Sequence, residues 1–135
     1  MGSYSVGKPP IMSLDPVESH SLQLIASSIE RIGRYTAGLE FEEFQADSMV
    51  QDAVLRNFEV ISAETRTIAP ARRAAHPGLP WNDMESLAAR VLDDRTPRDP
   101  AAIWDVIQHD LPPLVAPLAE VLRNEPTSDG GAVDP

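Results

Sequence analysis

The sequence predicts an all-α domain, a bundle of four to five helices. Apolar residues recur at spacings of three and four in several segments, which is the period of a helix with one buried face. No segment shows the strict alternation of a half-buried strand, and there is no internal repeat. Several of the 13 prolines stand where a helix would begin or end.

The first predicted helix begins at Asp15 and Pro16 and ends at Gly38. Asp15 can cap the first N–H groups, Pro16 suits the first helical position, and Glu18 can reach back to complete a capping box. Gly38 can adopt the left-handed conformation that closes a helix. The apolar stripe of this helix consists of Leu22, Ile25, Ile29 and Ile32.

A short helical turn is expected next, over residues 39–46. Its two phenylalanines, Phe41 and Phe44, are three residues apart and so lie on one side of a helical turn. We expect both rings to enter the core.

A second long helix opens at Asp47 or Ser48, and Gln51 would complete a capping box with Ser48. Pro70 stops or bends this helix, and residues 71–75 add one further turn. Its apolar side carries Val50, Val54, Phe58, Ile61 and Ile68.

The loop 76–80, HPGLP, is rich in residues that interrupt helices. After it, a helix is predicted from Trp81 or Asn82 to Asp93. The apolar residues that we expect this helix to bury are Met84, Leu87, Val91 and Leu92.

Residues 96–100 break the chain again, and a fifth helix begins with Asp99 as its cap and Pro100 at its first position. A last helical segment covers 112–122, with a kink expected at Pro117. The fifth helix would bury Ile103, Val106 and Ile107.

The length of 135 residues fits one helical domain, at 15–123, between a flexible arm at 1–14 and a disordered tail at 124–135. The absence of Cys excludes disulfides and thiolate chemistry. No stretch approaches the roughly 18 to 20 apolar residues of a membrane span. The N-terminus shows no basic-then-apolar signal pattern, so we expect a cytoplasmic protein without membrane contact.

The formal charge of −10, from 11 basic and 21 acidic residues, argues against a broad nucleic-acid-binding surface, although it leaves room for a small basic cleft. No glycine-rich phosphate loop is present in the helical part, and we expect no cofactor. The acidic run at Glu40, Glu42 and Glu43 is interpreted as a solvated face rather than a metal site. Structural or solvent roles are assigned to the three histidines, His20, His76 and His109.

The blocks of sequence that carry a family resemblance are RIGRYTAG at 31–38, Phe41 with Phe44, QDAVLRNFEVI at 51–61, HPGLPW at 76–81, IWDVI at 103–107 and DLPPL at 110–114. In order and spacing, with 22 residues between Trp81 and Trp104, they resemble the HepT family over residues 20–122. HepT proteins are small HEPN-superfamily domains, known as toxins of bacterial two-gene modules and paired with MntA-type nucleotidyltransferases. The resemblance implies an all-α HEPN-type bundle and a two-fold dimer with its active cleft at the interface.

Ribonucleases of this family use the motif Arg-x-x-x-x-His-x-Tyr between the two Trp-bearing blocks. Laid on residues 84–99, the resemblance puts Ala88 at the position of the Arg, Asp93 at that of the His and Arg95 at that of the Tyr. None of the three residues matches the motif. Arg95 also lacks the hydroxyl that, in the family, receives AMP from the paired nucleotidyltransferase.

The chemical cost of this change is large. Metal-independent RNA cleavage needs a proton-transfer group, and an Asp with its ordinary pKa of about 3.9 is a weak base and a poor acid near neutral pH. Loss of acid–base catalysis costs about 10²- to 10⁴-fold, and loss of a charge-stabilising donor about 10²- to 10³-fold. The sequence therefore predicts a catalytically inactive homologue that acts by binding, either to a nucleotidyltransferase or to an active homologue.

Two alternatives remain open. The chain could be an active RNA endonuclease toxin with a rebuilt site at Asp93 and Asp94, with a divalent metal and the neighbouring arginines. It could also be an interaction module with no role in a toxin–antitoxin pair. The residues that we single out as candidate RNA contacts are Arg90, Arg95 and Arg98.

Overall fold

The computed structural model describes residues 16–93, 95 and 97–124. This part of the chain is helical throughout and contains no strand, which confirms the predicted all-α class. The predicted arm at 1–14 and the cap Asp15 lie outside the described residues, as does the tail beyond Asn124. The helices are α1 (Pro16–Thr36), α2 (Phe41–Ala46), α3 (Ser48–Thr65), α4 (Pro70–Ala75), α5 (Trp81–Glu85), α6 (Leu87–Val91), α7 (Pro100–Asp105), the π-helix η3 (Val106–Asp110) and α8 (Pro112–Asn124).

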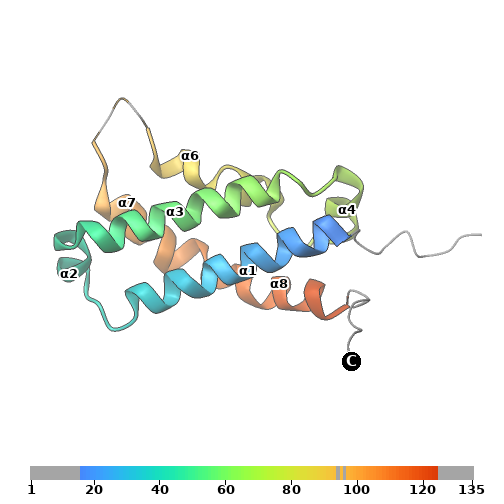
Figure 1. Cartoon of the computed structure of the whole chain (residues 1–135), viewed down its shortest axis with the longest axis horizontal. Helices are drawn as coiled ribbons and strands as arrows, with labels where there is room; N and C mark the ends of the chain where they lie inside the picture. Colours follow the sequence, from blue (N-terminus) through green and yellow to red (C-terminus); the bar gives the residue numbers. More distant parts are fainter. Residues whose placement is uncertain (1–15, 94, 96, 125–135) are drawn as a thin grey trace, which may run out of the picture.

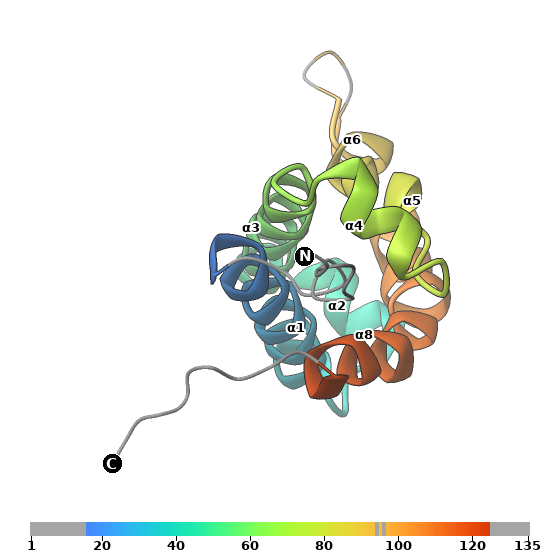
Figure 2. The ribbon, with the colours of Figure 1, turned by 90° about the vertical axis from the view of Figure 1, so that its right-hand side faces the viewer.

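The two longest helices, α1 and α3, run side by side in opposite directions (Figure 1). α8 packs against α1, while α5 and α6 pack against α3. Seen end-on, the helices surround one central core, with α6 and α8 on opposite sides of it (Figure 2). Among the described helices, none combines the length and the apolar character that crossing a bilayer requires.

α1 follows the predicted pattern. Pro16 is its first residue, and the predicted apolar stripe is buried. The helix ends at Thr36 rather than at Gly38, and Thr36 Oγ1 donates a hydrogen bond of 2.8 Å to Ile32 O. Gly38 has a φ of +78°, the left-handed conformation predicted for the residue that closes this helix.

The start of α3 decides between the two predicted caps. The Asp47 carboxylate accepts a hydrogen bond from Val50 N at 3.1 Å, so Asp47 is the cap and the predicted Ser48–Gln51 capping box is wrong. The buried Gln51 instead donates from Nε2 to Phe44 O at 2.8 Å and to Gln45 O at 3.0 Å. Gln51 thus joins α3 to the end of α2.

The phenylalanines of α2 reach the core to different depths. The Phe44 ring is fully buried with its centroid 5.1 Å from that of Trp104, whereas Phe41 is half-buried at 6.1 Å from the same ring. Trp104 belongs to α7, so these contacts fasten α2 to the later part of the chain.

α3 ends at Thr65, five residues before the predicted stop at Pro70, so Ile68 is buried but lies beyond the helix. Pro70 instead begins α4, which confirms the further turn predicted at 71–75. Glu18 of α1 contacts the connection between α3 and α4. Glu18, 5% exposed, accepts a hydrogen bond from Ala69 N at 2.9 Å and lies 3.4 Å from Arg72 Nε. Ala69 precedes Pro70 as the cap residue of α4, so the Glu18 carboxylate lies at the N-terminus of that helix, where a negative charge is favoured.

The helix predicted from Trp81 or Asn82 to Asp93 is divided in two at Ser86 and ends at Val91. Ser62 of α3 causes the break. Its hydroxyl accepts from Ala88 N at 2.9 Å and donates to Met84 O at 3.4 Å, two groups that would bond to each other in a continuous helix.

α7 begins as predicted, with Pro100 first and the Asp99 carboxylate accepting from the next two free N–H groups. The continuation at Val106–Asp110 is a π-helix rather than α-helix, closed by a bond of 3.1 Å from Leu111 N to Val106 O. α8 continues through Pro117 and includes Asn124, which the sequence placed in the tail.

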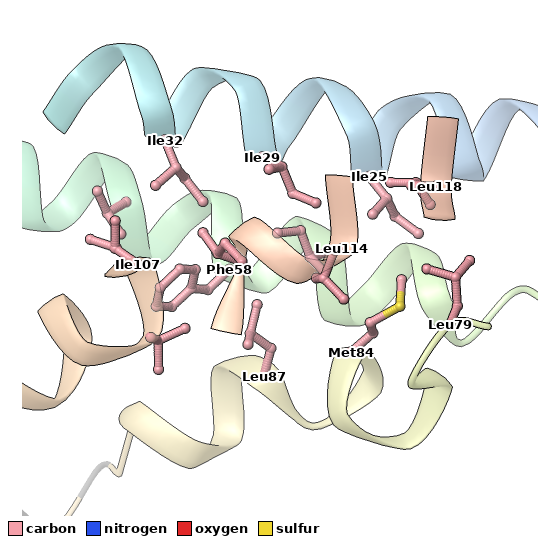
Figure 3. Packing of buried hydrophobic residues seen from close by; sticks show 14 of the residues in the cluster. Ile25, Ile29, Ile32, Phe58, Leu79, Met84, Leu87, Ile107, Leu114 and Leu118 are labelled. Atoms are coloured by element: carbon pink, nitrogen blue, oxygen red, sulfur yellow. The ribbon is translucent and has the colours of Figure 1, made fainter. Parts of the chain in front are cut away.

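The core receives side chains from all the longer helices. Figure 3 shows Phe58 of α3 between α1 and α6. Leu87 of α6 and Met84 of α5 enter the core from the side opposite α1. The predicted core residues Val50, Val91 and Leu92 are only partly buried. The fully or nearly buried apolar residues missed by the sequence pattern include Leu55, Leu79, Leu111, Leu114 and Leu118.

Candidate functional site

Ala88, which the resemblance aligns with the family's Arg, lies in α6 and is half-buried against the core. Its N–H is bound to the Ser62 hydroxyl on α3. A methyl side chain offers neither charge nor a hydrogen bond. Position 88 therefore contributes packing, and nothing that could stabilise a developing phosphate charge.

Asp93 and Arg95 lie in the connection from α6 to α7, which projects from the bundle (Figure 1). Asp93 Oδ1 accepts a hydrogen bond of 2.9 Å from Arg95 N and lies 3.7 Å from Arg95 Nε. The Arg95 side chain is 90% exposed. Two of the three motif positions are thus paired with each other at an exposed site.

Arg98 points away from these residues, toward the start of α3. Its Nη2 pairs with the Asp52 carboxylate, and its Nη1 donates to Gln51 Oε1 at 3.2 Å. The contact ties the end of the projecting connection to α3. The Arg98 guanidinium therefore already forms an ion pair with Asp52 of the same chain.

Arg90 lies at the end of α6 and reaches toward η3. Its Nη1 lies 2.7 Å from Asp110 Oδ2, and its Nη2 donates to Asp83 O at 3.5 Å. The three candidate RNA contacts thus diverge, and each is paired with an aspartate. The structure does not bring them together into one basic cleft.

The predicted metal alternative lacks a full ligand set in the part described. Asp94 lies outside the described residues, and Asp93 already accepts from Arg95. No group of three or more His, Asp or Glu residues in the described ranges could hold a metal ion.

The other polar residues considered from sequence have local roles. Glu43 Oε1 accepts from Glu40 N at 2.8 Å and so helps to cap α2. His20 is exposed on α1, and His76 is half-buried in the loop before α5. His109 is exposed in η3 with its Nδ1 2.9 Å from Asp105 Oδ1.

Two hollows were not found from the sequence, because their walls come from segments distant in the chain. One, of about 500 Å³, lies between the loop 77–80, α5, α6, η3 and the start of α8, and it contains Arg90 and His109. The other, of about 480 Å³, lies between α1 and α8 and is lined almost entirely by apolar side chains, including the half-exposed Val115. The apolar groove offers little to hold a phosphate.

The fold and these contacts define a small all-helical domain in which the segment between α6 and α7 carries arginines paired with acids. The chain belongs to the HepT-like ribonuclease family. A sequence model of that family, described as "Ribonuclease HepT-like", matches residues 25–121. The match covers every described helix from the second half of α1 to α8.

Several relatives share this similarity over most of their length. The "Probable ribonuclease HepT" of Thermococcus cleftensis is 30% identical over 93 residues, which are 69% of this chain and 84% of the relative. The "Putative RNase TTE0752" of Caldanaerobacter subterraneus subsp. tengcongensis is 26% identical over 82% of this chain and 95% of its own. The "Putative RNase MJ0127" of Methanocaldococcus jannaschii is 23% identical over 81% of this chain and 90% of its own. No solved structure matches this chain.

Proposed function

We propose that this chain is a catalytically inactive member of the HepT-like family that acts by binding. The observation that carries the proposal is the set of residues at the three motif positions, Ala88, Asp93 and Arg95. None of them supplies a proton-transfer group suited to neutral pH, and position 88 supplies no cation.

The charges around these positions support the same conclusion. Asp110, Asp93 and Asp52 each face one of the three nearby arginines. An RNA phosphate that approached this segment would have to compete with a carboxylate at every cation. The chain as a whole has a formal charge of −10 and would repel RNA further.

We propose a HEPN-type helical bundle that forms a two-fold homodimer, with an MntA-type nucleotidyltransferase as the partner. Both parts rest on what the resemblance to HepT proteins implies. The partner would bind without transferring AMP to position 95, because Arg95 has no hydroxyl. The activity and its control by nucleotide transfer would then be lost together.

The alternative is an active RNA endonuclease with a rebuilt site at Asp93 and Asp94 and the adjacent arginines. The names of the relatives, which describe ribonucleases, favour it. Such a site would need a divalent metal and further ligands. Cleavage by this route would stop in EDTA and in Asp93→Ala.

Two measurements test the proposal. The proposal predicts a neighbouring gene for an MntA-type nucleotidyltransferase. Co-expression with that protein should give a complex that survives size-exclusion chromatography, and light scattering should give twice the chain mass for the free protein. The purified chain should leave single-stranded RNA intact with or without Mg²⁺. RNA cleavage, or the absence of any complex together with a monomeric mass, would overturn the proposal.

A further inference from the structure

The hollow of about 500 Å³ between α5, α6, η3 and α8 combines an apolar floor with a charged rim. Met84, Leu87 and Leu114, which belong to the buried core, form the floor (Figure 3). The volume lies within the roughly 300 to 1,000 Å³ that is usual for ligand pockets. The space therefore suits a side chain or a small molecule with an apolar body.

The charged groups of the rim are Asp83, Arg90 and Asp110. Arg90 is engaged by Asp110 at 2.7 Å, so these two charges compensate each other. Among the described residues, nothing forms a hydrogen bond or an ion pair with the Asp83 carboxylate, while its backbone oxygen accepts from Arg90. These three groups together carry a net charge of −1.

This balance selects the class of ligand. A phosphate would meet an arginine that is already neutralised and two carboxylates that repel it. A wholly apolar ligand would cover Asp83 without giving it a partner, which is costly. A cation on an apolar stem satisfies both parts of the pocket, because its charge meets Asp83 and its stem meets the leucine and methionine floor.

His109 fits the same ligand. Its Nδ1 lies 2.9 Å from Asp105 Oδ1 and 3.2 Å from Asp105 O, so these two oxygens engage Nδ1 and leave Nε2 available. With the proton on Nδ1, Nε2 is an acceptor for an N–H donor. His109 and Asp110 both belong to η3, and π-helical turns are frequent at binding sites.

We propose that this pocket binds the side chain of an arginine or a lysine presented by a partner protein. The acidic chain attracts a basic partner at long range, and the pocket provides the specific contact. The inference goes beyond the proposed function by naming the chemistry of the contact, and it holds whether or not the chain cleaves RNA.

The test is an NMR titration of the ¹⁵N-labelled full chain with N-acetyl-arginine amide. N-acetyl-citrulline amide, which has the same shape and no charge, is the matched control. We expect millimolar binding of the arginine compound, with shifts centred on Gly78, Asp83, Arg90 and Asp110, and binding of the citrulline compound at least about fivefold weaker. An end-blocked peptide with one central arginine should bind more tightly than the amide if the natural ligand is a protein.

Two variants with equal net charge complete the test. Asp83→Asn should weaken the arginine compound by about fivefold, whereas Glu42→Gln, an exposed change on α2, should alter binding by less than about twofold. Equal binding of the two compounds, equal effects of the two variants, or shifts spread over the acidic surface would overturn the proposal. A peptide no tighter than the amide would overturn the assignment to a protein partner.

Discussion

The N–H of Ala88 donates a hydrogen bond of 2.9 Å to the hydroxyl of Ser62, which lies on another helix 26 residues earlier. The same hydroxyl donates to Met84 O at 3.4 Å. Ser62 thereby replaces the bond that a continuous helix would form between residues 88 and 84. The break that separates α5 from α6 is therefore made by α3, next to Ala88, which the resemblance aligns with the family's Arg.

The first prediction concerns this contact. Ser62→Ala removes both hydrogen bonds from a residue that is 2% exposed, and it should lower the free energy of unfolding by about 1 to 3 kcal/mol. Urea unfolding followed by far-UV circular dichroism measures the change. Ser86→Ala removes only an exposed bond of 3.4 Å and should change stability by less than about 0.5 kcal/mol. Equal effects of the two substitutions would show that Ser62 does not hold the break.

A second prediction concerns the Arg90–Asp110 pair, whose side chains are 38% and 36% exposed. A double-mutant cycle with Arg90→Ala and Asp110→Asn should give a coupling energy of only about 0.2 to 1 kcal/mol, because solvent screens the pair. The coupling should fall when the salt concentration rises from about 0.05 to 0.5 M. A coupling that salt leaves unchanged would argue against the ion pair.

The aromatic contact of α2 with α7 gives a third prediction. Phe44→Ala removes a fully buried ring beside Trp104 and should cost about 3 to 5 kcal/mol of unfolding free energy. Phe41→Ala removes a half-buried ring farther from Trp104 and should cost less than half as much. The midpoints of thermal unfolding should follow the same order, and the reverse order would contradict the assigned packing.

The features that the sequence predicted correctly are those whose causes are local. Asp99 starts α7 by accepting hydrogen bonds from N–H groups two and three residues later, and Pro100 suits the first helical position. Gly38 adopts the left-handed conformation after α1, which requires only the freedom of its own backbone. The stripe of α1 follows from helical periodicity alone. Such signals can be read without knowledge of the partner segment.

The features that the sequence missed depend on contacts between distant segments. The hydroxyl that breaks the helix at Ser86 belongs to Ser62 of α3. The sequence around position 86 contains no residue that would predict the break. Arg90 and Arg98 find partners 20 and 47 residues away, so their divergence could not be seen from their closeness in sequence. The pocket at Asp83 has the same origin, because its walls are brought together only by the fold.

The motif positions provide a fourth prediction. The triple substitution Ala88→Arg, Asp93→His and Arg95→Tyr introduces the family motif at the positions that the resemblance aligns with it, all of which are half-buried or exposed. It should create RNA cleavage that persists in EDTA, since the family chemistry needs no metal, with a gain of at least about 10²-fold over background. A triple variant that folds and remains inactive would show that these positions are not the reason for inactivity.

The central claim is that the unchanged chain does not cleave RNA. The most direct measurement is a cleavage assay with the purified full-length protein on single-stranded RNA, in EDTA and in Mg²⁺. The claim predicts intact RNA in both conditions, at a protein concentration at which the triple variant cleaves. Cleavage in EDTA by the unchanged chain would contradict the claim, and cleavage in Mg²⁺ that Asp93→Ala abolishes would establish the rebuilt site instead.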